Sequence, residues 1–234
     1  MLERQQTENF GIICAMKDIL KSTQGYELFT GMSLEEANRM LECLDAHVIS
    51  RDKGAAIFVE GSHANRFGVV LSGSLVVVKD GLDGGRVIIK RIGEKELVAA
   101  AQAFSGAKIM RVRVEAAAPS RILILNSERV CSPCCNGCAF HARLVRNVMR
   151  IISAKTLELN AKIEILSHRT TEDRILAYLR AFAEKCGSNE FDIPFDRQQL
   201  ADFLCVERSA LSAEISRLAR ADSFDCHKNH FKLA

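Results

Sequence analysis

The sequence contains no uninterrupted apolar run of the roughly 18 to 20 residues that a membrane span requires. Its first ten residues are polar and charged, without the basic start and apolar stretch of a signal peptide. It also lacks a glycine-rich phosphate-binding motif and a serine nucleophile with a positioned histidine and aspartate. We therefore expect a cytoplasmic protein that does not contact membranes and is not an enzyme.

A strong excess of positive charge is also missing. The 234 residues include 32 Lys and Arg against 29 Asp and Glu, which gives a formal net charge of +3. In residues 167–234, 10 basic minus 11 acidic residues gives −1. Nucleic-acid-binding domains are usually basic. Any DNA-binding face in this segment must therefore come from the local arrangement of charges.

The first half of the chain combines one helical pattern with many short strands. Apolar residues recur at three- and four-residue steps in residues 33–44, and Ser33 with Glu36 matches a capping box, so a helix is predicted. Between Val48 and Leu125, β-branched runs are separated by glycine-containing turns. This pattern predicts an antiparallel barrel, roll or sandwich. The predicted strands are residues 56–59, 67–71, 75–78, 87–89, 112–114 and 122–125.

A long helix is predicted for residues 140–166, which contain neither glycine nor proline. At 1.5 Å per residue such a helix is about 40 Å long, more than one small domain needs. A long amphipathic helix usually packs against a partner helix, in another subunit or in its own domain. Lys155 and Lys162 interrupt a strict heptad, so we expect a short, imperfect coiled coil. The apolar stripe consists of Leu144, Val148, Ile151, Ile152, Leu159, Ile163 and Leu166.

The last third of the chain contains shorter helical segments. Thr171 can cap a helix that stops at Gly187, and an extended piece follows at residues 191–195. Asp196 with Gln199 then matches a second capping box, which predicts another helix.

The segment after Asp196 has the pattern of a helix-turn-helix. The helix that it opens is followed by a turn at residues 205–207 and a second helix at residues 208–219. Small Ala201 allows the two helices to cross closely, and Val206 can fill the turn between them. Two strands, at residues 224–226 and 230–233, would form a wing.

In a helix-turn-helix the amino-terminal end of the second helix enters the major groove of DNA. Arginine there can read guanine, and serine can bond a base or a phosphate. An ordinary helical hairpin that binds nothing is the alternative at this point. The candidate DNA-binding residues are Arg197, Gln198, Glu207, Arg208, Ser209, Ser212, Ala213 and Arg217.

These motifs resemble those of the CRP/FNR family of bacterial transcription regulators. Residues 197–204 (RQQLADFL) followed by 208–212 (RSALS) resemble the family's recognition module. The glycines of the β segment are similar to those of its cyclic-nucleotide-binding-type β-roll, and the long helix matches its dimerisation helix. The glycines in question are Gly61, Gly68, Gly73 and Gly81.

The resemblance implies an α+β chain with a jelly-roll-like antiparallel β-roll, a long dimerisation helix and a C-terminal winged helix-turn-helix. On this basis we expect a sensor domain at 1–130, a cysteine-rich junction with the central helix at 131–168, and a DNA-binding domain at 169–234. It also implies a homodimer on a palindromic operator in double-stranded DNA, gated by an effector. RNA polymerase is the expected further partner.

Some positions depart from the family pattern. Cyclic-AMP-binding members hold the ribose with a Gly-Glu-Leu stretch, which residues 98–101 (VAAA) replace here. Their phosphate-binding Arg-Ser pair is replaced by Met110-Arg111, and a one-residue slip on a strand turns a side chain to the other face. We therefore expect weak or no binding of cyclic nucleotides. The iron-sulfur site near the amino terminus does not carry over, because only Cys14 and Cys43 occur in the first hundred residues.

Two departures concern the DNA-binding module. Ala213 stands where many relatives have an arginine, so the operator should differ from theirs. The glycine that usually follows the recognition helix is replaced by Asp222 or Ser223, which leaves the geometry before the wing open.

Four of the nine cysteines are crowded into residues 131–138, which does not suggest a secreted disulfide framework. With Ser132 as cap and Pro133 as first helical residue of the central helix, part of the cluster would share one helix face. Such ligands can hold zinc, iron or an iron-sulfur cluster, and thiols at a helix start suit redox sensing. The alternative without a binding site is that these are small, half-buried residues where the roll meets the helix. The candidate ligands are Cys131, Cys134, Cys135, Cys138 and His141.

The preferred hypothesis is a sequence-specific regulator gated by a redox, metal or small-molecule signal. The alternative is a thiol-dependent oxidoreductase that uses the same cysteine cluster, but no general base or cofactor cradle accompanies the thiols. A regulator that has lost its effector, or that has lost DNA binding, is a third possibility. The effector-binding residues are unknown from sequence.

Overall fold

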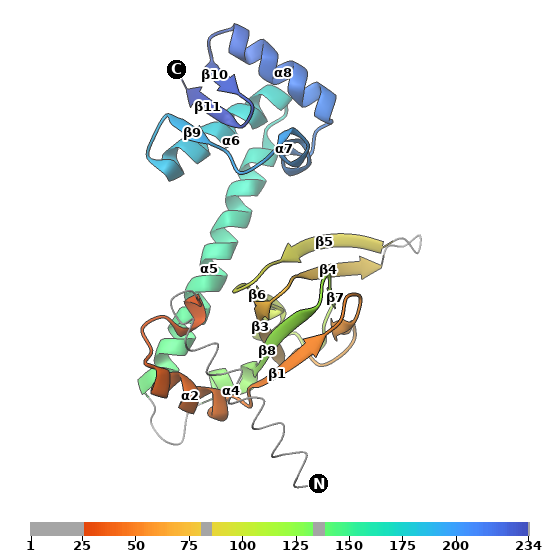
Figure 1. Cartoon of the computed structure of the whole chain (residues 1–234), viewed down its shortest axis with the longest axis vertical. Helices are drawn as coiled ribbons and strands as arrows, with labels where there is room; N and C mark the ends of the chain where they lie inside the picture. The colour runs from red at the N-terminus through yellow and green to blue at the C-terminus, as the bar shows by residue number, and fades with distance from the viewer. Residues whose placement is uncertain (1–25, 81–85, 133–138, 234) are drawn as a thin grey trace. The chain divides into compact units, whose positions relative to one another are not determined.

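The computed structural model describes residues 26–80, 86–132 and 139–233 (Figure 1). The chain divides into two compact units, Met1–Ser153 and Ala154–Ala234. The boundary falls within one long helix, α5 (Ala139–Ser167). Among the described helices, none combines the length and apolar character needed to span a bilayer.

The first unit begins with a short 3₁₀ turn, η1 (Glu27–Phe29), and helix α2 (Leu34–Cys43). The capping box predicted for α2 is present: the Glu36 amide donates to Ser33 Oγ over 3.2 Å, and the Ser33 amide donates to Glu36 Oε2 over 2.8 Å. This reciprocal pair satisfies two backbone donors that have no partner inside the helix. The helix predicted for this segment is thus confirmed.

Two four-stranded antiparallel sheets form the body of the unit, in the orders β1-β8-β3-β6 and β2-β7-β4-β5 (Figure 1). This arrangement confirms the α+β fold class and its amino-terminal β-roll. The strands are β1 (His47–Arg51), β2 (Ala56–Phe58), β3 (Arg66–Ser72), β4 (Leu75–Asp80), β5 (Arg86–Ile92), β6 (Leu97–Val98), β7 (Arg113–Ala116) and β8 (Ser120–Asn126).

The sheet that contains β8 is buried on both faces. Ile122 and Ile124 pack with side chains of the opposite sheet inside the roll. Leu123 and Leu125 face the other way, into a cluster with α2 and the first half of α5. Because side chains alternate along a strand, a run of four apolar residues covers both faces at once.

The sequence analysis missed five short elements of this unit. Two are strands: β1, which pairs with β8, and the two-residue β6 at the edge of the same sheet. The other three are helical: η1 and the five-residue helices α3 (Ala100–Phe104) and α4 (Ser127–Cys131). The helical segments and β6 are too short to show a period.

Helix α5 confirms the long helix predicted for residues 140–166. Ser132, expected to cap it, instead ends α4: its amide and hydroxyl both donate to the Glu128 carbonyl oxygen, at 2.9 and 2.7 Å. Pro133, the expected first residue of the long helix, lies outside the described residues. The first half of α5 buries Phe140, Leu144 and Val148 in the core of the first unit.

The second unit is a helical domain with a three-stranded sheet of order β10-β11-β9. Thr170, rather than Thr171, caps α6, because its Oγ1 accepts from the Asp173 amide over 3.0 Å. Gly187 ends α6 with a φ of +67°, as expected for a left-handed cap. The elements are α6 (Thr171–Cys186), β9 (Glu190–Asp192), α7 (Arg197–Leu204), α8 (Arg208–Arg220), β10 (Phe224–His227) and β11 (His230–Leu233).

Candidate nucleic-acid interface

Helix α7 is fixed at both ends. Its capping box is complete, because the Gln199 amide donates to Asp196 Oδ1 over 2.8 Å and the Asp196 amide donates to Gln199 Oε1 over 2.9 Å. Fully buried Ala201 allows α8 to approach closely, as the sequence predicted. The capping box therefore fixes the start of the helix, and buried Ala201 allows its close packing against α8.

The turn between α7 and α8 is short and held by backbone bonds. Cys205 adopts a left-handed conformation with φ of +53°. The Val206 amide donates a hydrogen bond to the Ala201 carbonyl oxygen over 3.0 Å. Val206 is half-buried against the core of the unit, which agrees with its predicted role in filling the turn. The two helices thus form one rigid pair.

Helix α8 buries one face and exposes the other. Leu211, Ile215 and Leu218 lie in the core. The opposite face carries the predicted base-reading residues: Arg208, Ser209 and Ala213 are exposed, and Ser212 is half-buried. Ser216 and Arg220 are exposed farther along the helix on the same side, and the sequence analysis missed both. Their spacing of four and eight residues from Ser212 would have identified them.

Glu207 is the N-cap of α8. Its carboxylate accepts hydrogen bonds from the Ala210 amide, over 3.0 Å, and from the Ser209 hydroxyl. The hydrogen bond from Ser209 and those from the backbone lower the pKa of Glu207 below its ordinary value of 4.5. A negative charge at this position is also stabilised by the positive end of the helix dipole.

Arg217, expected to contact phosphate, is exposed but is paired with carboxylates of its own domain. Its guanidinium lies 2.6 Å from a carboxylate oxygen of Glu172 on α6 and 2.7 Å from one of Glu214 on its own helix. The hydrogen bond from Arg217 lowers the pKa of Glu214. Arg217 therefore joins α6 to α8, and a phosphate contact by this residue would compete with two carboxylates.

Arg197 and Gln198 also make contacts within the unit. The guanidinium of Arg197 lies over the Phe231 ring, 5.4 Å from its centroid, and its Nη2 is 3.6 Å from Cys226 Sγ. The side-chain amide of Gln198 donates to Asp202 Oδ1 over 2.8 Å. Arg197 thus connects the first helix of the pair to the wing.

The wing is a hairpin of β10 and β11 with a two-residue turn, as predicted. Lys228 in this turn is exposed and has a φ of +56°. Asp222, one of the two residues expected in place of the family's glycine, has a positive φ of +54°. Aspartate tolerates this region better than most residues, so the chain enters the wing without glycine.

The predicted ligand cluster is only partly within the described residues. Cys134, Cys135 and Cys138 lie outside them, while Cys131 is exposed at the end of α4. His141 Nε2 lies 2.9 Å from the Val130 carbonyl oxygen, and its buried Nδ1 has no hydrogen-bond partner among the described residues. Because a carbonyl oxygen only accepts, this contact requires a proton on Nε2, and in the neutral ring Nδ1 then carries the lone pair. Within the described ranges, no group of three His, Cys, Asp or Glu side chains could hold a metal ion.

The residues that the family resemblance aligns with a cyclic-AMP site have a different chemistry here. Met110 is fully buried in the core of the roll, and Arg111 is exposed. The Arg111 amide is bonded to Gln102 Oε1 over 2.8 Å. An apolar side chain thus points inward at the position where the family pattern has a polar one.

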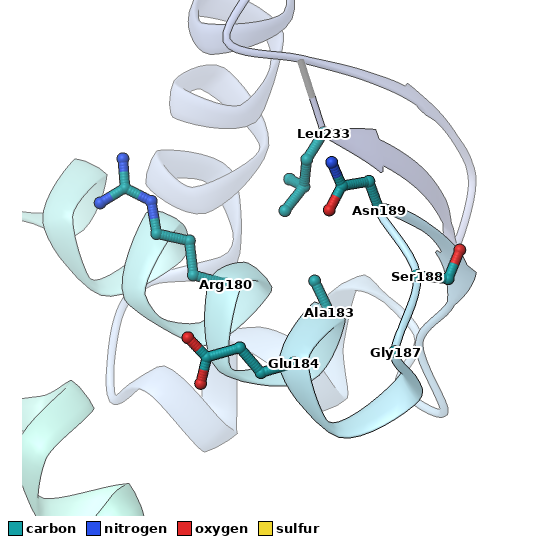
Figure 2. Close-up of a pocket in the computed structure, with 7 residues that line it drawn as sticks. All are labelled: Arg180, Ala183, Glu184, Gly187, Ser188, Asn189 and Leu233. Atoms are coloured by element: carbon teal, nitrogen blue, oxygen red, sulfur yellow. The ribbon is translucent and has the colours of Figure 1, made fainter.

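A separate hollow of about 680 Å³ lies between the carboxyl-terminal half of α6 and the end of β11 (Figure 2). Figure 2 shows Ala183 and Leu233 directed toward one another, with Arg180 and Glu184 projecting from α6 at the rim. None of the lining residues belongs to α7 or α8, so the hollow is distinct from the exposed face of α8.

Comparisons with known proteins concern the fold of the chain. Residues 48–131 match the family described as cyclic nucleotide-binding domain. Among solved structures, CprK complexed with OCPA has a TM-score of 0.59 and 15% identity, with 85% of this chain and 89% of that chain covered. The regulator CLP of Xanthomonas campestris has a TM-score of 0.53 and 17% identity, with 85% and 98% covered.

The Catabolite Activator Protein of Thermus thermophilus has a TM-score of 0.51 and 18% identity, with 89% of this chain and 93% of that chain covered. No curated protein matches the sequence. The class defined by the fold is therefore a β-roll of the cyclic-nucleotide-binding type combined with a winged helix-turn-helix. More particularly, the chain has the fold of the CRP/FNR-type transcription regulators.

Proposed function

We propose that the chain is a sequence-specific DNA-binding transcription regulator of the CRP/FNR type. The observation that carries the proposal is the exposed face of α8, which presents Arg208, Ser209 and Ala213 from a helix pair fixed by a capping box and a buried turn. In a helix-turn-helix this is the face that enters the major groove. Exposed Lys228 in the wing supplies a cation for the adjacent phosphates.

Dimerisation is supported by a row along α5 that is apolar apart from Thr156. Val145, Met149, Ile152, Thr156, Leu159 and Ile163 follow one another at alternating steps of four and three residues, which is the spacing of a coiled-coil seam. Met149, Leu159 and Ile163 are 63, 54 and 62% exposed in the single chain. A second copy of the helix would bury these side chains.

This proposed seam differs from the stripe predicted from sequence, whose Leu144 and Val148 lie in the core of the first unit, and it can be tested with a matched pair of variants. Leu159→Asp is expected to convert the dimer to monomer in sedimentation equilibrium, because it places a charge in the seam. Leu157→Asp introduces the same change two residues away, at a side chain that is 69% exposed and lies off the row. Dissociation by both variants, or by neither, would contradict this seam.

The signal is proposed to be something other than cyclic AMP. Buried Met110 and the sequence VAAA at residues 98–101 do not supply the carboxylate and arginine that a cyclic nucleotide requires. Proteins of this fold include a c-di-GMP responsive regulator and one complexed with OCPA, which supports a signal other than cyclic AMP.

A metal or redox centre at residues 131–141 is proposed as the switch. His141 supports it, because metal-bound histidines commonly donate their other ring N–H to a backbone carbonyl, as Nε2 can here to Val130. Loss of bound metal in His141→Ala, at unchanged secondary structure, would support the assignment. Equal metal content in the variant and the wild type would contradict it.

The proposed function is tested by operator selection from random DNA, with protein kept anaerobic and then exposed to air, and with metal content measured on the same sample. A palindromic consensus is expected. Arg208→Ala should weaken binding to the selected operator, whereas Lys185→Ala removes the same charge from an exposed site on α6 and should not. A folded dimer that enriches no sequence under either condition would overturn the proposal.

A further inference from the structure

The amino-terminal end of α8 presents side chains with opposite hydrogen-bonding character. Glu207, Arg208 and Ser209 are consecutive and all three are exposed. A guanidinium only donates hydrogen bonds, and an ionised carboxylate only accepts them. Which base this end of the helix can recognise therefore depends on which of these donors and acceptors already form hydrogen bonds within the protein.

Glu207 and Ser209 are bonded to each other, which fixes the character of both. The single hydroxyl proton of Ser209 is donated to Glu207 Oε2, so the serine offers only lone pairs to an incoming molecule. Glu207 Oε2 also accepts from the Ala210 amide over 3.0 Å. A carboxylate has about four acceptor sites, so these bonds leave capacity for a further donor. The two side chains together form an acceptor-only surface.

The lowered pKa of Glu207 agrees with this character, because the carboxylate stays ionised at neutral pH. Its position is also fixed, since the cap bond to Ala210 holds the carboxylate at the first turn of α8. The carboxylate is therefore a positioned acceptor and not a mobile surface charge.

The bases of DNA differ in how they would meet such a surface. In the major groove cytosine presents only the N4 amino donor, whereas adenine places its amino group beside the N7 acceptor. Thymine and guanine present acceptors, which an acceptor-only surface repels. Cytosine is thus the base that Glu207 and Ser209 fit, while the donors of Arg208 fit the N7 and O6 of guanine.

We propose that Glu207 is a specificity-determining residue that accepts a hydrogen bond from the N4 amino group of one cytosine in each operator half-site, with Arg208 on the guanine of the same or the neighbouring base pair. The proposal rests on the proposed DNA-binding function. It differs from a backbone-positioning role, because a carboxylate facing phosphates would weaken binding to every sequence alike.

The test is operator selection with the wild type and with Glu207→Gln. Glutamine can keep the cap through its Oε1 but adds an N–H donor, so the preference for cytosine at one position per half-site should fall by about tenfold. Glu184→Gln removes the same charge from an exposed site on α6 and should leave the preference unchanged. Circular dichroism and thermal melting verify that both variants are folded.

A measurement on the wild type avoids any dependence on a folded variant. The selected cytosine is replaced by 2-pyrimidinone, which lacks the N4 amino group, and affinity at this position should fall by about tenfold. The same replacement at a cytosine outside the half-site is the control and should change little.

The outcomes separate the two proposals. A consensus whose cytosine preference survives Glu207→Gln and the 2-pyrimidinone replacement overturns the role of Glu207 and leaves the regulator standing. A uniform change of affinity at all positions in Glu207→Gln also overturns it, because this is the behaviour of a charge near phosphates. The absence of any consensus for the wild type overturns the proposed function, and the role of Glu207 with it.

Discussion

The guanidinium of Arg174 donates to the carbonyl oxygen of Leu204, the last residue of α7, over 3.2 Å. Its Nε donates at the same time to the carbonyl oxygen of His168 over 2.9 Å. One side chain from α6 thus holds the end of the first helix of the pair and the junction between α5 and α6.

Removing this side chain should loosen the turn of the helix-turn-helix. In Arg174→Ala, the Leu204 carbonyl loses a charge-assisted bond, which is typically worth about 1.5–3 kcal/mol. We expect faster hydrogen exchange at the amides of Cys205 and Val206 by mass spectrometry. Lys185→Ala, a cation at the other end of α6, is the control, and equal exchange in all three proteins would contradict the role of Arg174.

Two glycines with the same backbone conformation should respond differently to alanine. Gly73 and Gly54 both have a φ of +86°, but a Cβ on Gly73 would lie 2.4 Å from the Pro119 carbonyl oxygen and Ser120 Oγ, whereas a Cβ on Gly54 meets nothing within 4 Å. Gly54→Ala should cost only the backbone strain of about 1–2 kcal/mol. Gly73→Ala should cost clearly more, because the turn must move. Urea unfolding curves compare the two, and equal losses would contradict this account.

Asn147 connects α5 to the start of the first unit. Its buried side-chain amide donates to the carbonyl oxygens of Leu28 and Thr30, each over 3.0 Å. Asn147→Ala leaves both carbonyls without this donor, and we expect a loss of about 1–3 kcal/mol in the free energy of unfolding. Asn160→Ala changes an exposed asparagine of the same helix and should cost less than about 0.5 kcal/mol in the same denaturation experiment.

Tyr178 predicts a response to alkaline pH. Burial raises its pKa to about 12, from the ordinary value of 10.0. The unfolded chain ionises this phenol first, so its contribution to stability is complete below pH 10 and is lost as pH rises toward 12. Spectrophotometric titration of the phenolate absorbance should show a late ionisation, and Tyr178→Phe should remove that phase.

The same variant tests the buried hydroxyl. Tyr178 Oη is buried and has no hydrogen-bond partner among the described residues. Deleting an unsatisfied polar atom should leave the stability at neutral pH unchanged or raise it. A large loss of stability in Tyr178→Phe would show that the hydroxyl has a partner, such as a water molecule.

The sequence predicted the larger elements well because their signals are local. The capping boxes of Ser33 and Asp196 and the glycine-free run of α5 are read from adjacent residues, and the structure contains each of them. The third strand of the winged sheet, β9, was read only as an extended piece. Its partner β11 lies about forty residues later, and such pairings leave no local pattern.

The exposure of the candidate DNA-binding residues on α8 was predicted from the sequence, but the contacts of the candidate residues were not. Spacing placed Arg208, Ser209 and Ala213 on the exposed face of α8, where the structure has them. It assigned Arg217 to phosphate, because nothing in the sequence shows that Glu172, 45 residues earlier, lies 2.6 Å away. The hydrogen bond between Glu207 and Ser209 is likewise a matter of rotamers, which spacing alone does not determine.

The internal ion pairs of the second unit bear on how its affinity for DNA would respond to salt. Arg217 is shared by Glu172 and Glu214, and Lys232 lies 3.5 Å from Glu190, so these cations are balanced within the protein. A contact of either cation with a phosphate would have to compete with these carboxylates. Each phosphate contact contributes about 0.9 to the slope of log K against log salt, so Arg217 and Lys232 would add less to this slope than their charges alone indicate. The salt dependence would then report mainly on the cations of the unit that are not held by carboxylates, such as Arg208.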